Sequence, residues 1–445
     1  MQDNKLYLKM KIQKGIMNKN DVLKHVTLDG VRLHLRVDER KLWINGYYVL
    51  FLNKTANELL ANLIDSCYEV PQNLVMERTI SKVKKKHFIT SRKTIQKDIH
   101  SLIGIINSFA RNDIPAHLVG MKIIPEENKT APNRMDLSLT YKCNNKCPHC
   151  YLDENSSGDL DTEDWKYILD KLWKIGVPQV VFTGGECTLR SDLPELVFYA
   201  KRFITGIISN GTNITDTLAM KLKAGELDWI QITLNSHKEK THDLMQGRKG
   251  AYKETIKGIK NCLKSNIQTS INITITKKNK DDVLGIIDLA KKLGVTSVSS
   301  NALINSGRGV AKKEKDGLSE KELKEIIVDA NEYAKKKGIE FNWFLPTCYK
   351  NLNPIELGFG QRCCSACSVN MMVEPNGDVI PCQSWTQLQL GNMLRTRWED
   401  IWNNSETKRI REFGYAPNGC RDCSDFKLCG GACPLERINC RTCGK

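Results

Sequence analysis

The chain has 445 residues, of which 40% are hydrophobic and 27% charged; this balance is typical of a globular protein and excludes a disordered one. The longest apolar runs are too short to span a membrane, and the lysine-broken N-terminus does not resemble a signal peptide, so we expect a cytoplasmic protein without membrane contact. The net charge of +16 raises the possibility of nucleic-acid binding. Because lysines alternate with acidic residues along the helical segments, we prefer solvation or attraction to an acidic peptide.

The N-terminal part is predicted to consist of a tail over 1–27 and a small α+β domain over 28–126. Residues 26–53 alternate polar and apolar side chains around the turns LDG and ING, a pattern typical of a hairpin or meander. Helical periodicity follows, and Thr55 with Glu58 is expected to form a capping box. A further helix fits 91–110, and strands followed by such helices suggest a winged-helix-like domain. A basic patch, SKVKKKHFITSRKTIQKD, lies at 81–98.

Residues 132–340 show six repeats of a strand followed by a helix. Apolar, strand-like stretches begin near residues 135, 179, 206, 229, 269 and 297, and a helical stretch follows each. Such alternation predicts a parallel sheet with helices outside, and we expect a partial (β/α)6 barrel of the TIM type. Functional groups in such folds gather at the carboxyl ends of the strands.

Three cysteines directly follow the first of these strands. Cys143, Cys147 and Cys150 have the spacing C-x3-C-x2-C, and no other cysteine lies within 30 residues. In a cytosolic protein such cysteines indicate metal binding or catalysis rather than disulfides. Three thiolates can hold three irons of a [4Fe–4S] cube and leave one iron for a ligand that is not protein. A zinc site completed by His149 is the alternative, although zinc prefers paired C-x2-C ligands.

The C-terminal part, 341–445, is rich in cysteine and poor in apolar residues, so cross-links of some kind must supply much of its order. Ten of the 17 cysteines lie beyond residue 360. Cys420, Cys423, Cys429 and Cys433 have the spacing C-x2-C-x5-C-x3-C. A zinc ribbon is the rival interpretation, because Cys420/Cys423 and Cys440/Cys443 form two C-x2-C pairs. It leaves the remaining cysteines unexplained.

The triplet and the segments after it resemble the radical S-adenosylmethionine (SAM) enzymes. In that family the open iron binds the amino and carboxylate groups of SAM, and a reducing electron cleaves SAM to a 5′-deoxyadenosyl radical. The resemblance implies that the three cysteines at 143–150 hold the catalytic cluster. FTGGECTLR at 182–190 resembles the family's GGE segment, with Cys187 in place of the usual proline. It implies that the SAM ammonium is received by Gly184, Gly185 and Glu186.

Two later segments, SNGT at 209–212 and QITLNS at 231–236, resemble the family's third and fourth strand ends. The resemblance implies SAM contacts from Ser209, Asn210, Thr233 and Asn235. Thr233 keeps the hydroxyl of the usual serine, whereas Asn235 lacks the charge of the usual aspartate. His149 stands where a planar side chain usually lies beside the adenine.

The C-terminal cysteines resemble the SPASM extension of these enzymes, which carries two auxiliary [4Fe–4S] clusters. The resemblance implies three clusters in all, together with SAM. The first auxiliary cluster would be bound by Cys364, Cys382 and Cys433, with Cys363 or Cys367 as a candidate fourth ligand, or with one iron open. The second would be bound by Cys420, Cys423, Cys429 and either Cys440 or Cys443.

The N-terminal domain loosely resembles the PqqD-like domain that binds the leaders of precursor peptides, and the basic patch would suit an acidic leader. We therefore expect a radical SAM/SPASM maturase of a ribosomally made peptide, forming a thioether or a carbon–carbon cross-link. Its partners would be that peptide and a reductant such as flavodoxin or ferredoxin, with nucleic acid not expected. Two alternatives stay open: a formylglycine-forming enzyme of the anaerobic sulfatase-maturating type, and a zinc-stabilised nucleic-acid-binding protein.

Overall fold

The computed structural model describes residues 22–28, 31–44, 48–110, 129–152 and 158–437. The chain divides into two compact units. The first comprises residues 1–131 with the segments 169–179 and 202–204, and the second comprises the remainder. No helix in the described ranges is both long enough and apolar enough to cross a bilayer.

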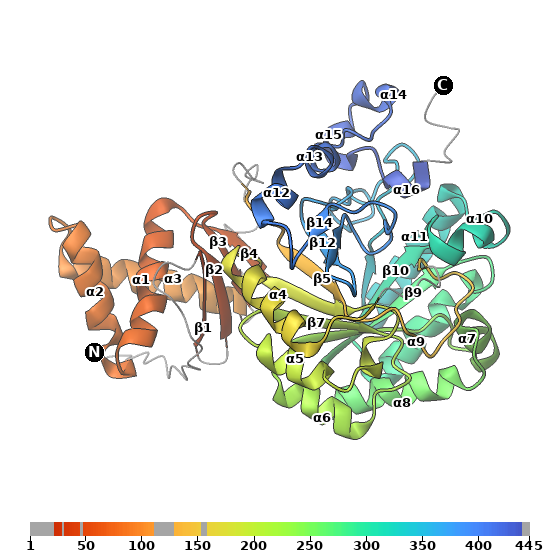
Figure 1. The fold of residues 1–445 in the computed structure, drawn as a ribbon, viewed down its shortest axis with the longest axis horizontal. Helices are drawn as coiled ribbons and strands as arrows, with labels where there is room; N and C mark the ends of the chain where they lie inside the picture. The colour runs from red at the N-terminus through yellow and green to blue at the C-terminus, as the bar shows by residue number, and fades with distance from the viewer. Residues whose placement is uncertain (1–21, 29–30, 45–47, 111–128, 153–157, 438–445) are drawn as a thin grey trace. The chain divides into compact units, whose positions relative to one another are not determined.

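The N-terminal unit contains a four-stranded antiparallel sheet, followed in the chain by three helices (Figure 1). The sheet has the order β1-β2-β3-β4, so β1 and β4 are its edges. Strand β1 begins five residues before the predicted start of this domain. The elements are β1 (Leu23–Leu28), β2 (Val31–Arg36), β3 (Lys41–Ile44), β4 (Tyr48–Phe51), α1 (Lys54–Glu69), the 3-10 turn η1 (Gln72–Leu74), α2 (Val75–Lys86) and α3 (Arg92–Ala110).

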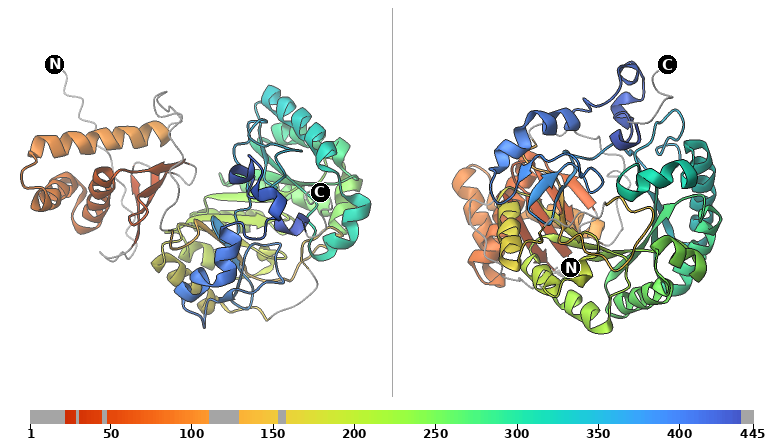
Figure 2. Two further views of the ribbon diagram at one scale, coloured as in Figure 1. Left: turned by 90° about the horizontal axis from the view of Figure 1, so that it is seen from above. Right: turned by 45° about the vertical axis from the view of Figure 1, so that its right-hand side comes forward.

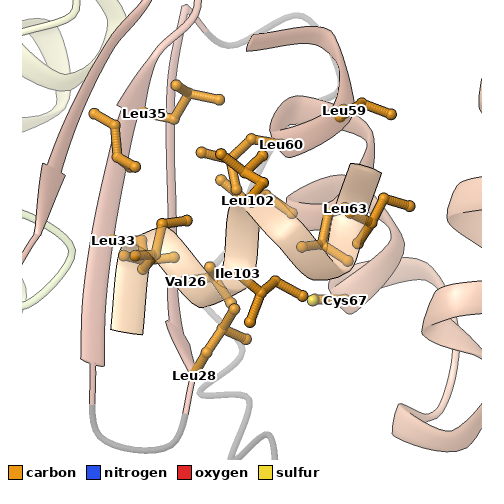
Figure 3. Close-up of a cluster of buried hydrophobic side chains, with 14 of the residues drawn as sticks. Val26, Leu28, Leu33, Leu35, Leu59, Leu60, Leu63, Cys67, Leu102 and Ile103 are labelled. Carbon is orange, nitrogen blue, oxygen red and sulfur yellow. The ribbon is translucent and has the colours of Figure 1, made fainter. Parts of the chain in front are cut away.

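One apolar core joins the sheet of this unit to its helices. Inward-facing residues of β1 and β2 meet side chains of α1 and α3 (Figure 3). Leu60 and Ile64 of α1 are fully buried there, as helical i, i+4 spacing requires. The predicted cap of α1 is wrong: Asn53 is the N-cap, and its side-chain oxygen accepts from the Ala56 N–H at 2.8 Å. Glu58 instead pairs with basic side chains at the end of α2, so no capping box forms.

The second unit is built on a ten-stranded sheet in the order β11-β10-β9-β8-β7-β6-β5-β12-β13-β14. The six predicted strands appear consecutively as β5 to β10. Strands β7, β8, β9 and β10 pair in parallel, each with the next. The near-continuous burial of β5, β6 and β7 is typical of parallel strands covered on both faces, whereas β8 and β9 alternate between buried and more exposed residues. The strands are β5 (Arg134–Ser138), β6 (Gln179–Thr183), β7 (Ile204–Ser209), β8 (Trp229–Thr233), β9 (Gln268–Ile275) and β10 (Ser297–Ala302).

Helices between these strands lie along the outer side of the sheet, forming an arc around it in Figure 2 (right). One of them, α7, has no counterpart among the predicted elements. The helices are α4 (Thr162–Lys174), α5 (Leu193–Tyr199), α6 (Asp216–Ala224), α7 (Glu239–Gln246), α8 (Ala251–Lys264), α9 (Val283–Leu293), α10 (Val310–Asp316) and α11 (Glu320–Lys337), with 3-10 turns η3 (Cys187–Leu189), η4 (Lys280–Asp282) and η5 (Gly307–Gly309).

The C-terminal region extends the sheet at both edges. Strand β11 pairs in parallel with β10, and β12 pairs in parallel with β5. The cysteine-rich segment is therefore hydrogen-bonded to the strand that leads into the cysteine triplet. The elements are β11 (Glu340–Trp343), β12 (Asn370–Val373), β13 (Asp378–Ile380), β14 (Gly391–Asn392), α12 (Trp398–Asn403), α13 (Ser405–Arg411), α14 (Asn418–Arg421), α15 (Phe426–Cys429) and α16 (Pro434–Arg437).

Candidate active site and auxiliary cysteine clusters

The cysteine triplet and most of the predicted SAM contacts line one cavity of about 450 Å³ at the carboxyl ends of β5 to β10. Strand ends thus bring together residues that lie far apart in the sequence, as the fold rule predicts. Cys143 is exposed, whereas Cys147 and Cys150 are half-buried. The predicted residues on the cavity wall are Cys143, Cys147, His149, Cys150, Gly184, Gly185, Ser209, Asn210 and Thr233.

Gly184 and Gly185 bring the end of β6 against the start of the cysteine loop. A Cβ on Gly184 would lie 2.2 Å from the Thr140 carbonyl oxygen, and one on Gly185 would lie 2.5 Å from that of Tyr141. The Gly185 N–H donates to the Thr140 oxygen at 2.8 Å. Only glycine permits so close an approach of two backbones. These glycines therefore position the cysteine loop, in addition to bordering the cavity.

The Glu186 carboxylate is 1% exposed and is not part of the cavity wall. It accepts hydrogen bonds from the Ser209 hydroxyl at 2.8 Å and from the Asn210 N–H at 2.7 Å. Both the hydroxyl and the N–H of Thr188 donate to it as well. Burial raises the pKa of Glu186, and these donors oppose the shift. In this geometry Glu186 holds the end of β7 against the end of β6.

Asn235 also lies away from the cavity, fully buried behind the end of β8. Its side-chain oxygen accepts from the Thr274 N–H at 2.9 Å, and its carbonyl accepts from the Asn279 side chain at 2.7 Å. Asn235 thus joins β8 to β9. Thr233, two residues earlier, does line the cavity.

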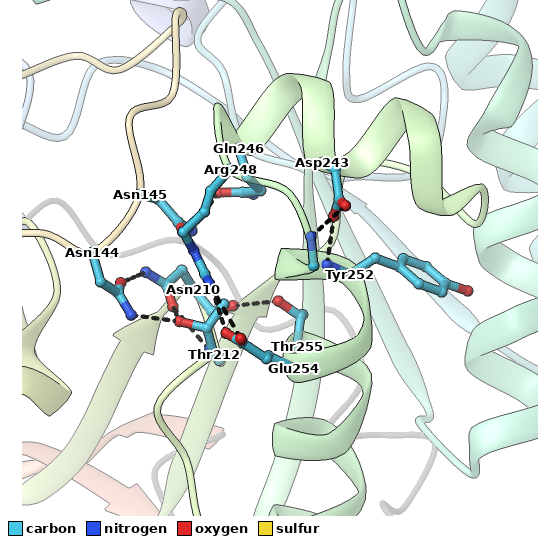
Figure 4. A network of polar contacts seen from close by, with 12 residues as sticks. Asn144, Asn145, Asn210, Thr212, Asp243, Gln246, Arg248, Tyr252, Glu254 and Thr255 are labelled. Carbon is cyan, nitrogen blue, oxygen red and sulfur yellow. Dashed lines mark hydrogen bonds and ion pairs between the residues drawn. The ribbon is translucent and has the colours of Figure 1, made fainter.

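A polar network braces the cysteine loop from the corner between α7 and α8 (Figure 4). The Gln246 side-chain oxygen accepts from the Asn145 side chain at 2.9 Å and from the Cys147 thiol at 3.1 Å. The Gln246 carbonyl accepts from the Lys146 N–H at 3.0 Å. Arg248 donates to Asn145 at 2.7 Å and pairs with Glu254. Sequence reasoning missed this network, because α7 is only eight residues long and few of its residues are apolar.

Gly247 is essential to the contact between the end of α7 and the cysteine loop. It ends α7 in the left-handed conformation, with φ +62°, and a Cβ there would lie 2.2 Å from the Lys146 carbonyl oxygen. Both requirements favour glycine. On the other side of the loop, the Asn210 side chain donates to Asn144 at 2.8 Å.

The thiols of the triplet lie close enough to influence one another. Burial and the neighbouring thiols Cys150 and Cys143 raise the pKa of Cys147, and Arg308 opposes the shift. Burial, together with the charges of Lys278 and Arg308, lowers the pKa of His149 to about 4, so its imidazole is neutral near pH 7. Three adjacent thiols beside an open cavity match the donor set of an iron–sulfur cluster with one iron left for a further ligand.

The C-terminal cysteines form a second group of thiols, and the two candidate fourth ligands, Cys363 and Cys367, both lie near it. Burial raises the pKa of Cys364, Cys382 and Cys433 to about 12. In each case the charge of one of the other two thiols contributes to the shift. Cys367 is fully buried, and Cys364 and Cys382 raise its pKa further after burial. The Cys367 thiol therefore lies near enough to Cys364 and Cys382 for their charges to act on it. No three His, Cys, Asp or Glu side chains in the described ranges converge on a single-ion site.

Cys367 has φ +58°, in the left-handed region that disfavours side chains with a Cβ. Such a conformation costs about 1–2 kcal/mol and persists only where the surroundings require it. Its N–H donates to the Asn370 carbonyl at 3.0 Å. A strained backbone that places a buried thiol among three others fits a ligand role for Cys367.

The predicted second auxiliary set is described only in part. Cys420 lies in α14, Cys423 follows it, and Cys429 ends α15. The Gly431 N–H donates to the Cys429 sulfur at 3.3 Å. Cys440 and Cys443 lie outside the described residues. Cys187, outside both cysteine groups, is fully buried with its thiol near the Phe182 and Ile208 carbonyls, and it does not line the cavity.

Comparison with known proteins identifies both cysteine-bearing regions. Residues 137–304 match the radical SAM superfamily, and residues 363–424 match SPASM, described as an iron-sulfur cluster-binding domain. Fe-coproporphyrin III synthase of Methanosarcina barkeri is 30% identical over 292 residues, covering 60% of this chain and 72% of that protein. Mycofactocin maturase MftC of Mycolicibacterium smegmatis is 28% identical over 336 residues, covering 70% of this chain and 81% of that protein.

Among solved structures, Streptococcus suis SuiB bound to its precursor peptide SuiA has a similar fold. The TM-score is 0.65 at 16% identity, and the match covers 93% of this chain and 94% of SuiB. The fold and the thiol-lined cavity thus define an iron–sulfur enzyme that uses SAM. The chain belongs to the radical SAM superfamily and carries a SPASM domain.

Proposed function

We propose that this enzyme modifies a ribosomally synthesised precursor peptide, forming a thioether between a cysteine sulfur and a carbon of the peptide. The observation that carries the proposal is the extent of the SuiB match. Because it covers 93% of this chain, it includes most of the N-terminal unit, and that SuiB structure holds a precursor peptide. A carbon–carbon cross-link is the next candidate product.

The cavity residues have distinct roles in this proposal. Cys143, Cys147 and Cys150 would hold a [4Fe–4S] cluster, which with SAM supplies a carbon radical that abstracts a substrate hydrogen. The neutral His149 offers a planar surface for the adenine. The backbone of Gly184 and Gly185 and the polar ends of β7 and β8 would orient the amino acid part of SAM. Glu186 and Asn235 would position the strand ends that border the SAM site.

The C-terminal thiols would hold two further clusters, three in all. For the first auxiliary cluster we propose the ligands Cys364, Cys367, Cys382 and Cys433, which leaves no iron open. For the second we propose Cys420, Cys423 and Cys429 with one further cysteine. Buried thiols with raised pKa values are poor thiolates alone, and binding to iron supplies the positive charge that stabilises them. A low-potential donor such as flavodoxin or ferredoxin would supply electrons.

The N-terminal unit would bind the leader of the peptide as a PqqD-like, winged-helix-like domain, and the parallel sheet would be a partial barrel. Strands β1 and β4 are edges whose main-chain groups can pair with an extended peptide. The turn between α2 and α3 is flanked by Lys84, Lys85, Lys86 and Lys93, and Phe88 and Ile89 there are 78% and 87% exposed. This combination suits an acidic leader that also carries apolar side chains.

The identity to Fe-coproporphyrin III synthase favours a second candidate, a porphyrin-type small molecule as substrate. That match covers only 60% of this chain, whereas the SuiB match covers 93%. The formylglycine-forming alternative has the same weakness. Membership of the radical SAM superfamily argues against the zinc-stabilised nucleic-acid-binding alternative.

The test begins with protein reconstituted anaerobically with iron and sulfide, reduced, and supplied with SAM and a cysteine-containing precursor peptide. We expect 5′-deoxyadenosine and a peptide that has lost a pair of hydrogen atoms, and neither product from Cys147→Ala. The same peptide without its leader should be modified far more slowly. Deoxyadenosine formation with modification of a porphyrin, but of no peptide, would refute the proposal and select the second candidate.

A further inference from the structure

A second cavity, larger than the catalytic one, lies beside it in the same compact unit. Its volume is about 760 Å³, against about 450 Å³ for the cavity that the cysteine triplet lines. Ala302, at the carboxyl end of β10, lines both cavities, so the two are neighbours. No predicted SAM contact and no predicted cluster ligand lines the second cavity, so the proposed cofactors do not fill it.

Three separate parts of the chain form the walls of the second cavity. One is the end of α10 with the start of α11, and another is the segment 345–351 that follows β11. The third consists of Ala432 and Glu436, which lie on either side of Cys433, a predicted ligand of the first auxiliary cluster. The second cavity therefore adjoins both the catalytic cavity and the first auxiliary cysteine set.

Polar contacts between these parts fix the shape of the second cavity. Lys313 of α10 pairs with Glu436 of α16 at 2.6 Å. The N–H of Asn305, which follows β10, donates to the same carboxylate at 2.8 Å. On the other side, Glu320 of α11 accepts from the Cys348 N–H at 3.2 Å. Each wall is thus tied to another, and the space between them is a built feature of the fold.

The rim of the second cavity carries an excess of positive charge. Of the carboxylates that line it, Glu320 and Glu436 are engaged in the contacts above, and Glu325 is exposed. Three exposed lysines line it as well, and no ion pair within the described ranges involves them: Lys321, Lys324 and Lys350. Such a rim attracts an acidic partner.

We propose that the second cavity binds an acidic segment of the substrate peptide, next to the residue whose side chain enters the catalytic cavity. The inference rests on the proposed function, because it takes a peptide as the substrate. The rim lysines would pair with carboxylates of this segment, and the apolar walls would contact its side-chain carbons. The apolar wall residues are Leu318, Leu323, Leu345 and Pro346.

The first test measures the alkylation of Cys348 in the unaltered, cluster-loaded enzyme. This half-buried cysteine lines the second cavity and belongs to neither auxiliary set. Under anaerobic conditions, with iodoacetamide in excess over all thiols, its modification is followed by mass spectrometry with and without the precursor peptide. At a peptide concentration of about ten times the Kd, we expect alkylation of Cys348 to be roughly tenfold slower.

The second test reverses two charges on the rim. Lys321→Glu/Lys324→Glu should raise the KM for the precursor peptide by roughly tenfold, because two ion pairs become repulsive. The matched control is Lys257→Glu/Lys260→Glu, which changes two exposed lysines of α8, also three residues apart, that line neither cavity. The control should keep the KM of the unaltered enzyme. The iron content of each variant shows whether it has folded and bound its clusters.

Equal KM values for the two lysine variants would overturn the inference. A peptide that is modified by the enzyme but leaves Cys348 as reactive as before would overturn it as well. If Cys348 does not react even without the peptide, the KM values alone decide. Failure of the proposed function gives a different result, since the unaltered enzyme would then modify no peptide at all.

Discussion

The contact between Gly247 and the cysteine loop yields a sharp prediction, because the chain offers a matched control three residues away. Gly247 and Gly250 both have positive φ, at +62° and +84°. A Cβ on Gly247 would lie 2.2 Å from the Lys146 carbonyl oxygen, whereas a Cβ on Gly250 would have nothing within 4 Å. Gly247→Ala and Gly250→Ala thus share the cost of left-handed backbone and differ in the clash.

The expected magnitudes follow from these contacts. Alanine in the left-handed region costs about 1 kcal/mol, and both variants incur it. In Gly247→Ala the Cβ must also move away by roughly 0.8 Å, since real Cβ contacts essentially never fall below 3.0 Å. That shift breaks the Lys146–Gln246 and Asn145–Gln246 hydrogen bonds, each worth about 1 kcal/mol. Gly247→Ala should therefore destabilise the cysteine loop by about 2 kcal/mol more than Gly250→Ala does.

Hydrogen exchange at the Lys146 amide reports on this loop directly, because that N–H donates to the Gln246 carbonyl. A difference of about 2 kcal/mol corresponds to roughly 30-fold faster exchange in Gly247→Ala, measured anaerobically on the loaded enzyme. The same variant should retain less iron after reconstitution. Equal exchange rates at Lys146 in the two variants would refute the reasoning.

Three further changes test other parts of the structure. Leu60→Ala should destabilise the N-terminal unit by about 2–5 kcal/mol, because Leu60 is fully buried in its core; an unchanged urea unfolding transition of that unit would contradict this. Although burial opposes the shift, hydrogen bonds from Lys82 and Arg78 hold the pKa of Glu69 at about 2. Since the folded pKa is depressed, its stabilisation is present above pH ~4.5 and is lost as the pH falls toward 2, so Glu69→Gln should flatten the dependence of unfolding on pH in that window. Cys367→Gly should relieve backbone strain yet remove a thiolate, so the EPR signal of the first auxiliary cluster should change without a fall in melting temperature.

Much of the second unit could be predicted from its sequence. Strands β5 to β10 are short segments separated by amphipathic helices, and this alternation is typical of a parallel sheet with helices outside it. The spacing of the triplet and the fold rule for strand ends placed the three cysteines at the cavity, and the resemblance to the radical SAM enzymes placed the other six of the nine site residues there.

The parts that were not predicted depend on contacts between distant segments. Gln246 reaches Cys147 across 99 residues, from a helix of eight residues that begins without a side-chain cap. Glu186 stays a predicted SAM contact, but its hydrogen bonds to hydroxyl and N–H groups of the next strand end were not predicted, because the sequence does not reveal these groups as neighbours. Cys367 was one of two candidate ligands of the first thiol group, and its positive φ is a feature that the spacing of cysteines does not specify.

The parallel pairing of β12 with β5 has a consequence for attempts to dissect this enzyme. Strand β5 has β6 on one side and β12 on the other. A chain truncated after the last helix of the radical SAM region would expose one side of β5, along with its unsatisfied N–H and C=O groups. Such a bare, apolar edge invites pairing between molecules, so the shortened protein should aggregate. The cysteine-rich region thus also serves as a shield for the catalytic sheet.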